Sequence, residues 1–235
     1  DNLICNYEDI QKLDFLKNTN NSNVGCDKFI YNEPNYNKND YLIYNEYNKE
    51  ITIEHLEFIL NKYGVKHKIK NFNLFKTAFT SKTYSKEYYV KGFNKYGKGN
   101  ISFKKGYNLI TNNIKDNKKE CLELNEISNE RLEWFGDAKL AEIISSYIEE
   151  RYPNEDEGFL TTFRSKLVRK ETLANIAVKL EFNKYILMSK QIEVYEKGRE
   201  SYDLSEDCFE AFIGALTKEF KYEKCSHKLD KFLIN

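Results

Sequence analysis

The chain has 235 residues, of which 40% are hydrophobic and 31% are charged, so it can bury a core and form one large or two small domains. Its 37 basic and 37 acidic residues cancel, which excludes a uniformly basic nucleic-acid binder and requires any basic surface to be local. No stretch reaches the roughly 18 apolar residues of a membrane-spanning helix, and the first residues carry no targeting pattern. We therefore expect a soluble intracellular protein without a membrane partner.

Helix-breaking residues are scarce, with two Pro and ten Gly, which favours an all-α fold. Residues 1–50 are rich in Asn and Tyr and form an N-terminal extension whose order the pattern does not define. From Ile51 apolar residues recur at helical spacing, with Gly64 expected to end the first helix, and a second helix is expected around 74–79. Residues 85–128 then break the helical rhythm, which we interpret as a small insertion, either irregular or a hairpin.

Helical periodicity is continuous after Asn129, and Pro153 separates the first two helices of this part. The predicted helices lie at 129–151, 157–168, 171–181, 204–219 and 222–233. Asp203 and Glu206 have the spacing of a capping box, which predicts the start of the fourth of these helices. We therefore predict a helical domain over 51–235, interrupted by the insertion at about 85–128.

The five cysteines form no CxxC motif and no cluster with histidine, which argues against a structural zinc site. We interpret them as reduced thiols. Cys5 and Cys26 lie in the same N-terminal stretch and could pair, but an odd total defines no disulfide framework.

Two pairs of carboxylates lie on the predicted helices. Glu133 and Asp137 are four residues apart, and Asp207 and Glu210 are three apart, so each pair projects from one face of its helix. Apolar residues occupy other positions on both helices, which places the acids beside a buried stripe. Acids at this spacing usually form only a solvated face, and that interpretation stays open for either pair alone.

Gly136 and Gly214 lie beside these acids inside otherwise strong helices, where glycine costs about 1 kcal/mol relative to alanine. A close crossing of the two helices would offset that cost and bring the four carboxylates together. Because like charges raise one another's pKa, four anions cannot share a small site fully ionised without a cation. Oxygen ligands favour hard ions, so we expect Mg²⁺, or Mn²⁺, rather than zinc.

Two segments resemble the acidic motifs of a known family. Asn129-Glu-Arg-Leu-Glu-Trp-Phe-Gly-Asp-Ala138 resembles the signature of the ribonuclease III family, with Trp-Phe where Phe-Leu is usual. Asp207-Cys-Phe-Glu-Ala-Phe-Ile-Gly-Ala-Leu216 resembles the other acidic helix of that family. Segments at 152–158 and 164–174 fit between them in order and spacing. The resemblance covers about 51–84 and 129 to the end.

The resemblance implies a ribonuclease III-type helical endonuclease domain that hydrolyses double-stranded RNA as a homodimer, with each protomer cutting one strand and leaving a short 3′ overhang. By matched position, the catalytic residues and metal ligands are Glu133, Asp137, Asp207 and Glu210. Glu157 matches a supporting acid near the metal or the subunit interface, and a surface acid at a helix start is the alternative. Trp134 matches an aromatic that fills a pocket of the partner subunit, and an ordinary core residue is the alternative.

Metal ions at such a site activate water for in-line attack and stabilise charge on the leaving 3′ oxygen. His55, His67 and His227 lie outside the motifs, which disfavours a route in which histidine acts as acid or base and the RNA 2′-hydroxyl attacks. Products are therefore expected to carry 5′-phosphate and 3′-hydroxyl ends.

A basic segment near the acidic helices is the expected place of RNA contact, because A-form RNA is read mostly through phosphates and 2′-hydroxyls. Its cations are Arg164, Lys166, Arg169 and Lys170, for which a solvated helix face is the alternative. Two other functions remain open. A catalytically inactive ribonuclease III-like module that binds structured RNA or scaffolds a ribonucleoprotein would be marked by lost metal ligands. A purely structural helical dimer would leave the acidic pairs without a purpose.

Overall fold

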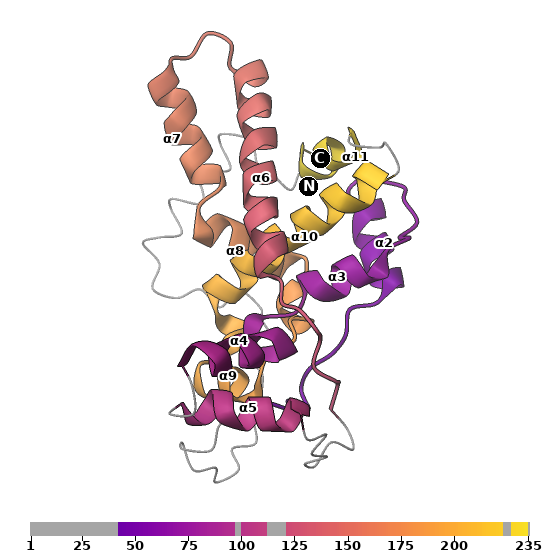
Figure 1. Cartoon of the computed structure of the whole chain (residues 1–235). Helices are drawn as coiled ribbons and strands as arrows, with labels where there is room; N and C mark the ends of the chain where they lie inside the picture. Colours follow the sequence, from indigo (N-terminus) through magenta and orange to yellow (C-terminus); the bar gives the residue numbers. More distant parts are fainter. Residues whose placement is uncertain (1–41, 97–99, 112–120, 223–226, 235) are drawn as a thin grey trace.

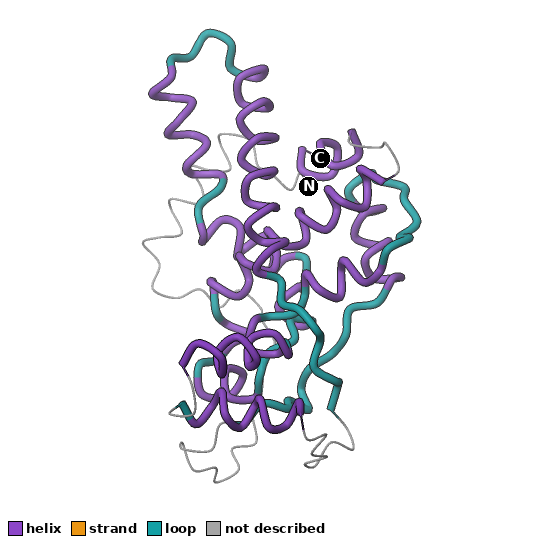
Figure 2. Tube along the Cα trace, in the orientation of Figure 1, coloured by secondary structure: helices purple, strands orange, loops and turns teal. Residues whose placement is uncertain are grey.

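The computed structural model describes residues 42–96, 100–111, 121–222 and 227–234. All of the regular elements in these ranges are helices (Figures 1 and 2). The β-type pairing in the same ranges consists of two isolated bridges. The predicted all-α fold is confirmed. Within the same ranges, no helix combines the length and the apolar character needed to span a bilayer.

The described part of the chain contains ten α-helices and three 3-10 turns. Their bounds are α2 Ile53–Lys62, α3 Phe72–Ala78, α4 Lys86–Tyr96, α5 Ile101–Thr111, α6 Glu130–Arg151, α7 Glu157–Leu167, α8 Lys170–Lys179, α9 Lys190–Tyr195, α10 Tyr202–Tyr222 and α11 His227–Ile234, with the 3-10 turns η2 Lys82–Tyr84, η4 Phe182–Lys184 and η5 Gly198–Glu200. The helices predicted after residue 129 agree with α6, α7, α8 and α10 to within a few residues, whereas the last one starts later than predicted. The sequence did not predict α9, because six residues are too few to show a helical period.

The first helix ends as the sequence predicts. Gly64 follows the cap residue Tyr63 and has a φ of 76°, in the left-handed region. Its N–H donates to the carbonyl oxygen of Asn61 (3.0 Å), and the N–H of Val65 donates to that of Leu60 (2.8 Å). These two bonds form a Schellman motif, in which glycine is preferred because it has no Cβ.

The helix α10 lies at the centre of the fold and packs against α6, α8 and α3 (Figure 1). Its apolar face is fully buried and consists of Phe209, Phe212, Ile213 and Leu216. The ring of Phe212 contacts four aromatic rings from other segments, those of Phe75, Phe79, Phe182 and Phe232. Buried aromatic rings contribute strongly to a core, so the helix that carries two of the predicted acids is held firmly in place.

The insertion predicted at about 85–128 contains a hairpin of two helices, α4 and α5 (Figure 1). The expectation that helical rhythm breaks throughout this segment is wrong over both helices. A Cβ on Gly92 would stand 2.2 Å from the ring of Phe103, and one on Gly106 would stand 2.1 Å from the ring of Tyr89. The two glycines thus provide the surfaces on which the aromatic rings pack. Residues 97–99 and 112–120 of the predicted insertion lie outside the described residues.

Residues 42–50, at the end of the predicted N-terminal extension, pack onto the helices. Ile43 is buried in a second apolar cluster with Tyr84, Tyr89, Leu124 and Leu187. The buried Asn48 donates a hydrogen bond to the carbonyl oxygen of Met188 (2.9 Å). The domain boundary between 50 and 51 stays a prediction, and the rest of the extension lies outside the described residues.

The capping box predicted at the start of α10 is wrong. This helix begins at Tyr202, and the hydroxyl oxygen of Ser201 accepts a hydrogen bond from the N–H of Leu204 (3.3 Å). Asp203 and Glu206 lie instead 2.5 Å and 3.6 Å from the ammonium of Lys170 on α8. The tertiary fold therefore brings the Lys170 ammonium to both carboxylates. The spacing of the two acids alone does not predict this contact.

Candidate active site

The two helices that carry the predicted acids cross at their glycines. A Cβ on Gly136 of α6 would lie 1.8 Å from the carbonyl oxygen of Glu210, and a Cβ on Gly214 of α10 would lie 2.3 Å from that of Leu132. Neither position could carry a side chain without moving a backbone. The close crossing predicted from the two glycines is confirmed, and it places the acidic pair of α6 beside the acidic pair of α10.

The carboxyl group of Glu210 is the most perturbed of the four acids. Glu210 is only 9% exposed. Burial raises its pKa to about 8, and repulsion from Asp137 is the next largest cause, followed by Glu206, Glu133 and Asp207. These contributions show that carboxylates from both helices act on one another across the crossing.

The carboxyl groups of Glu133 and Asp207 are perturbed in the same direction. Burial raises the pKa of Glu133 to about 7, and repulsion from Asp207 is the next largest cause. Burial also raises the pKa of Asp207 to about 6, and here Glu206 is the strongest neighbour. The ammonium of Lys82 opposes both shifts. Glu206, which the sequence offered only as a capping residue, is therefore part of the acidic cluster.

The donor set fits a divalent cation. Like charges held together in a partly buried place are stabilised by a cation, and carboxylate oxygens suit Mg²⁺ or Mn²⁺. In the conformation described, no three Asp, Glu, His or Cys side chains of the described ranges are close enough to hold a metal ion together. Four mutually repelling carboxylates are expected to stand apart until a cation draws them together.

A hollow of about 390 Å³ opens beside the acids. Glu133 and Asp207 line it together with Glu130, and Asp137 and Glu210 do not. Two other walls come from segments that the sequence did not single out, Ser81 to Thr83 and the stretch from Ile192 to Ser201. Tertiary hydrogen bonds bring the first of these into place, because Ser81 N–H donates to Leu187 O (2.9 Å) and Asn129 N–H donates to Thr80 O (2.8 Å).

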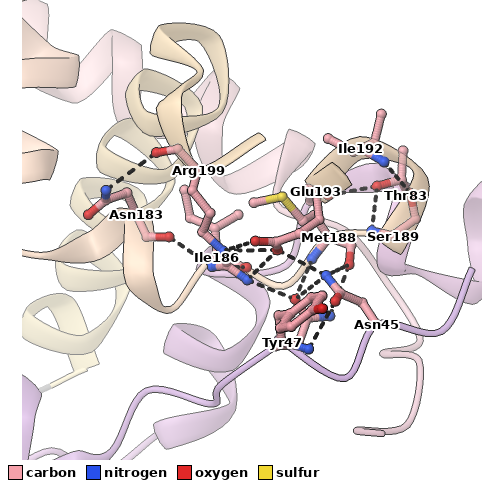
Figure 3. Close-up of polar contacts among 12 residues, drawn as sticks. Asn45, Tyr47, Thr83, Asn183, Ile186, Met188, Ser189, Ile192, Glu193 and Arg199 are labelled. Carbon is pink, nitrogen blue, oxygen red and sulfur yellow. Dashed lines mark hydrogen bonds and ion pairs between the residues drawn. The ribbon is translucent and has the colours of Figure 1, made fainter. Parts of the chain in front are cut away.

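A buried ion pair supports one of these walls. Arg199 is 2% exposed and Glu193 is fully buried, and the guanidinium Nε donates to both carboxylate oxygens (3.0 and 2.9 Å; Figure 3). The same guanidinium donates to the carbonyl oxygens of Asn183 and Ile186 (2.8 Å each), and Asn45 donates to the Glu193 carboxylate (3.0 Å). The network joins α9 and η5 to residues 42–50.

The structure separates the four cations predicted to contact RNA. Lys170 lies at the acidic cluster, in contact with two carboxylates. Arg169 donates to the hydroxyl oxygen of Thr172 (3.2 Å). Arg164 donates to the hydroxyl oxygen of Ser145 (3.3 Å), on the arm that α6 and α7 form (Figure 1), and the half-buried Lys166 lies on the same helix. Lys170 is therefore in contact with acids of α10, whereas Arg164 lies on the arm.

Trp134 and Glu157 lie outside the acidic cluster. Trp134 is 76% exposed, so the alternative that it is a core residue is wrong. Glu157 begins α7, accepts a hydrogen bond from the hydroxyl of Thr161 (3.2 Å) and lies beside Ile148 on α6. The rise of α6 between Asp137 and Ile148 is about 16 Å, so one chain does not bring Glu157 to the other four acids.

Of the described cysteines, neither Cys121 nor Cys208 lines the hollow. Cys5, Cys26 and Cys225 lie outside the described residues. Cys208 is fully buried next to Asp207, and burial raises the pKa of its thiol. A buried thiol with a raised pKa is a poor nucleophile and a poor ligand.

Comparison with known proteins identifies the acidic helices. The profile of the Ribonuclease III domain matches residues 130–220, from the start of α6 nearly to the end of α10. Ribonuclease 3 of Streptococcus gordonii is 48% identical over 88 residues, which are 37% of this chain and 38% of that protein. Ribonuclease 3 of Bacteroides thetaiotaomicron is 38% identical over 109 residues, which are 46% of this chain and 33% of that protein. The matched segments thus span only about a third of these relatives.

The fold comparison reaches further along the chain. A solved nuclease domain of ribonuclease III from Campylobacter jejuni superposes with a TM-score of 0.52 at 25% identity, covering 77% of this chain and 96% of that one. A second structure of the same domain gives a TM-score of 0.51 and covers 93% of that chain. The four acids and the glycine crossing all lie in the part of the chain that the domain profile matches. Residues 130–220 are therefore similar to the Ribonuclease III domain, and the fold around them is similar to the nuclease domain of ribonuclease III.

Proposed function

We propose that this chain is a ribonuclease III-type endoribonuclease that hydrolyses phosphodiester bonds of double-stranded RNA with a divalent metal ion. The products would carry 5′-phosphate and 3′-hydroxyl ends with short 3′ overhangs. The observation that carries the proposal is the crossing of α6 and α10 at Gly136 and Gly214, which sets two acidic pairs against each other within the matched domain. The mutual repulsion of these acids supports a role as cation ligands.

Glu133, Asp137, Asp207 and Glu210 would hold Mg²⁺, or Mn²⁺. The chemistry that such an ion supplies is activation of water and stabilisation of charge on the leaving 3′ oxygen. Glu133 and Asp207 line the hollow and would face the scissile phosphodiester. The glycine crossing keeps the backbones of the two pairs at a fixed separation, so that the site is ordered before substrate arrives.

The described histidines support this route over one in which histidine acts as acid or base. The ring of His67 pairs with Glu219 (3.0 Å), and the ring of His55 packs against Tyr185. Neither residue lines the hollow. Attack by water rather than by the RNA 2′-hydroxyl is what yields a 5′-phosphate and a 3′-hydroxyl.

We also propose that two copies form the working enzyme, each cutting one strand. Trp134 is next to Glu133 on α6 and exposes 76% of its surface, which favours a role at a contact between copies. One of the Campylobacter jejuni nuclease-domain structures is described for flexibility in a region involved in its dimer formation. In such a pair, Glu157 would serve as a supporting acid at the interface, since it is remote from the acids of its own chain.

The basic residues Arg164, Lys166, Arg169 and Lys170 would bind the RNA backbone. Arg164 is exposed on the arm, and Lys170 stands at the edge of the acidic cluster, so together they extend from the site along α7 and α8. Phosphates and 2′-hydroxyls are the groups that an A-form duplex presents to such cations.

Cleavage of a long RNA duplex with Mg²⁺, with Mn²⁺ and with EDTA tests the proposal, alongside a single-stranded RNA. We expect duplex cleavage with either metal, none with EDTA, and loss of cleavage in Glu210→Gln. Glu142→Gln is the matched control, because Glu142 is an exposed acid of α6 paired with Lys139 and should leave cleavage unchanged. Binding of duplex without cleavage in either metal would identify the inactive RNA-binding module instead, and undiminished cleavage by Glu210→Gln would remove that residue from the site.

A further inference from the structure

Lys82 lines the same hollow as Glu133 and Asp207. Its side chain is exposed, and among the described residues no carboxylate lies within 4 Å of its ammonium. Its charge nevertheless acts on both acids, since it lowers the pKa of Glu133 and of Asp207 against the other causes. Lys82 is thus a cation close to the site that no acid of the described ranges neutralises by direct contact.

The backbone that carries Lys82 is fixed on both sides. The neighbouring Ser81 and Thr83 are buried, and their hydroxyl groups lie 3.0 Å apart in a hydrogen bond. The hydroxyl oxygen of Thr83 also accepts the N–H of Ser189 (3.2 Å), and Tyr84 N–H donates to Ser81 O (2.9 Å). The Lys82 ammonium therefore extends from a rigid base into open space beside the acids.

Lys170 differs from Lys82 in the contacts of its ammonium. It also lies near the acidic cluster, but its ammonium is 2.5 Å from Asp203 and 3.6 Å from Glu206. An RNA phosphate would have to displace these carboxylates to reach it. Lys82 has no such contact with the part of the chain that the structure describes, so an arriving anion would meet its ammonium directly.

We propose that Lys82 binds a non-bridging phosphate oxygen of the RNA strand that lies in this hollow, next to the phosphodiester at the acids. The inference deepens the proposed function and rests on it. A lysine ammonium serves phosphate as a compact point charge, and a hollow of 390 Å³ is within the range of about 300–1,000 Å³ that holds small-molecule ligands, which is enough for one nucleotide. The acids would hold the metal on one wall, and Lys82 would hold the strand from the other.

The test compares Lys82→Gln and Lys82→Arg with Lys62→Gln, an exposed lysine of α2 that does not line the hollow. Binding of a short RNA duplex is measured in Mg²⁺ in the Glu210→Gln background as a function of salt, and cleavage is measured with Glu210 intact. For Lys82→Gln we expect a roughly 5-fold to 10-fold weaker Kd and a salt dependence of log K that is shallower by about one. KM should rise more than kcat falls, Lys82→Arg should recover most of the affinity, and Lys62→Gln should match the parent.

Because Lys82 is exposed, we expect all three variants to have the same melting temperature. A weaker Kd at an unchanged melting temperature would then reflect a lost phosphate contact and not a folding defect. Unchanged affinity and an unchanged salt slope in Lys82→Gln would overturn the inference, as would a parent that does not bind duplex. Cleavage by the wild-type chain is judged separately. If it is absent, the proposed activity fails while the binding data still decide on Lys82; if it is present and Lys82→Gln is normal, only the inference fails.

Discussion

Gly136 on α6 lies against the backbone carbonyl of Glu210 on α10, so closely that a Cβ on the glycine would stand 1.8 Å from that oxygen. The residue that forms the packing contact is thus also one of the four acids. The helix crossing and the acidic cluster therefore meet at Glu210. A change in the packing of the two helices must alter the electrostatics of the site.

Gly136→Ala should destabilise the fold and impair the site together. The added methyl group meets backbone rather than a flexible side chain, so the helices must separate, at a cost of about 1–3 kcal/mol or more in the free energy of unfolding. Urea unfolding measures this, and cleavage should fall because the acidic pairs move apart. Gly158→Ala is the control, since its Cβ would meet only an Asp156 carboxylate oxygen at 3.3 Å. Equal effects of the two substitutions would contradict the role of the crossing.

Metal binding should stabilise the chain more at pH 8 than at pH 6. The pKa values of Glu133, Asp207 and Glu210 are raised from 4.5, 3.8 and 4.5 to about 7, 6 and 8. The folded chain therefore holds more protons than the unfolded one, so without metal its stability should fall as pH rises from about 4 towards 8. A cation binds the ionised acids, so the increase in Tm with Mg²⁺ should grow over the same window.

Thermal unfolding at several pH values, with Mg²⁺ and with EDTA, measures this dependence. Glu210→Gln cannot ionise at that position, so its stability without metal should vary less between pH 6 and pH 8. An increase in Tm with Mg²⁺ that does not depend on pH would speak against binding at these acids.

Breaking the Arg199–Glu193 pair should be among the most damaging single changes. Glu193→Ala leaves a buried guanidinium without its carboxylate, which typically costs about 3–5 kcal/mol of stability. Replacing both by apolar residues, as in Arg199→Met with Glu193→Leu, should cost less, because no charge is left unpaired. The control is Glu181→Ala, which breaks an exposed pair with Lys184 and should cost under about 1 kcal/mol. If the double variant unfolds more easily than Glu193→Ala, the buried charge is not the cause.

Trp134→Ala should change assembly and not the stability of the single chain. An indole that is 76% exposed contributes little to the core of its own chain, so urea unfolding at low concentration should be nearly unchanged. Sedimentation should show the wild type as a dimer at micromolar concentration and the variant shifted towards monomer. Phe58→Ala removes another exposed aromatic, 64% accessible, and should leave the dimer intact. A wild type that sediments only as monomer would contradict the paired-site proposal.

The features that the sequence predicted correctly depend on residues that are close together in the sequence. The period of apolar residues places α6 and α10, the three- and four-residue spacings place each acidic pair on one face, and Gly64 ends α2 through its own backbone conformation. Even the crossing could be predicted, because a glycine inside a strong helix requires a compensating contact.

Local pattern failed where a partner distant in the sequence changed the outcome. Asp203 has the spacing of a capping residue, but Lys170 binds it and Ser201 caps the helix. The local pattern predicts an irregular segment or a hairpin at 85–128, but α4 and α5 form in it, and aromatic rings of the opposite helix pack on Gly92 and Gly106.

The sequence by itself determined the helical class, the two acidic pairs and the resemblance to the ribonuclease III family, since periodicity, spacing and motif order are all properties of the sequence. Only the tertiary structure decided that Lys82 shares a hollow with Glu133, that Arg199 is buried against Glu193, and that Trp134 is exposed. Each of these depends on contacts between distant parts of the chain or on their absence; the Arg199–Glu193 pair, for example, is enclosed by Asn45 and Asn48. Such contacts follow from how helices pack, and no local pattern encodes them.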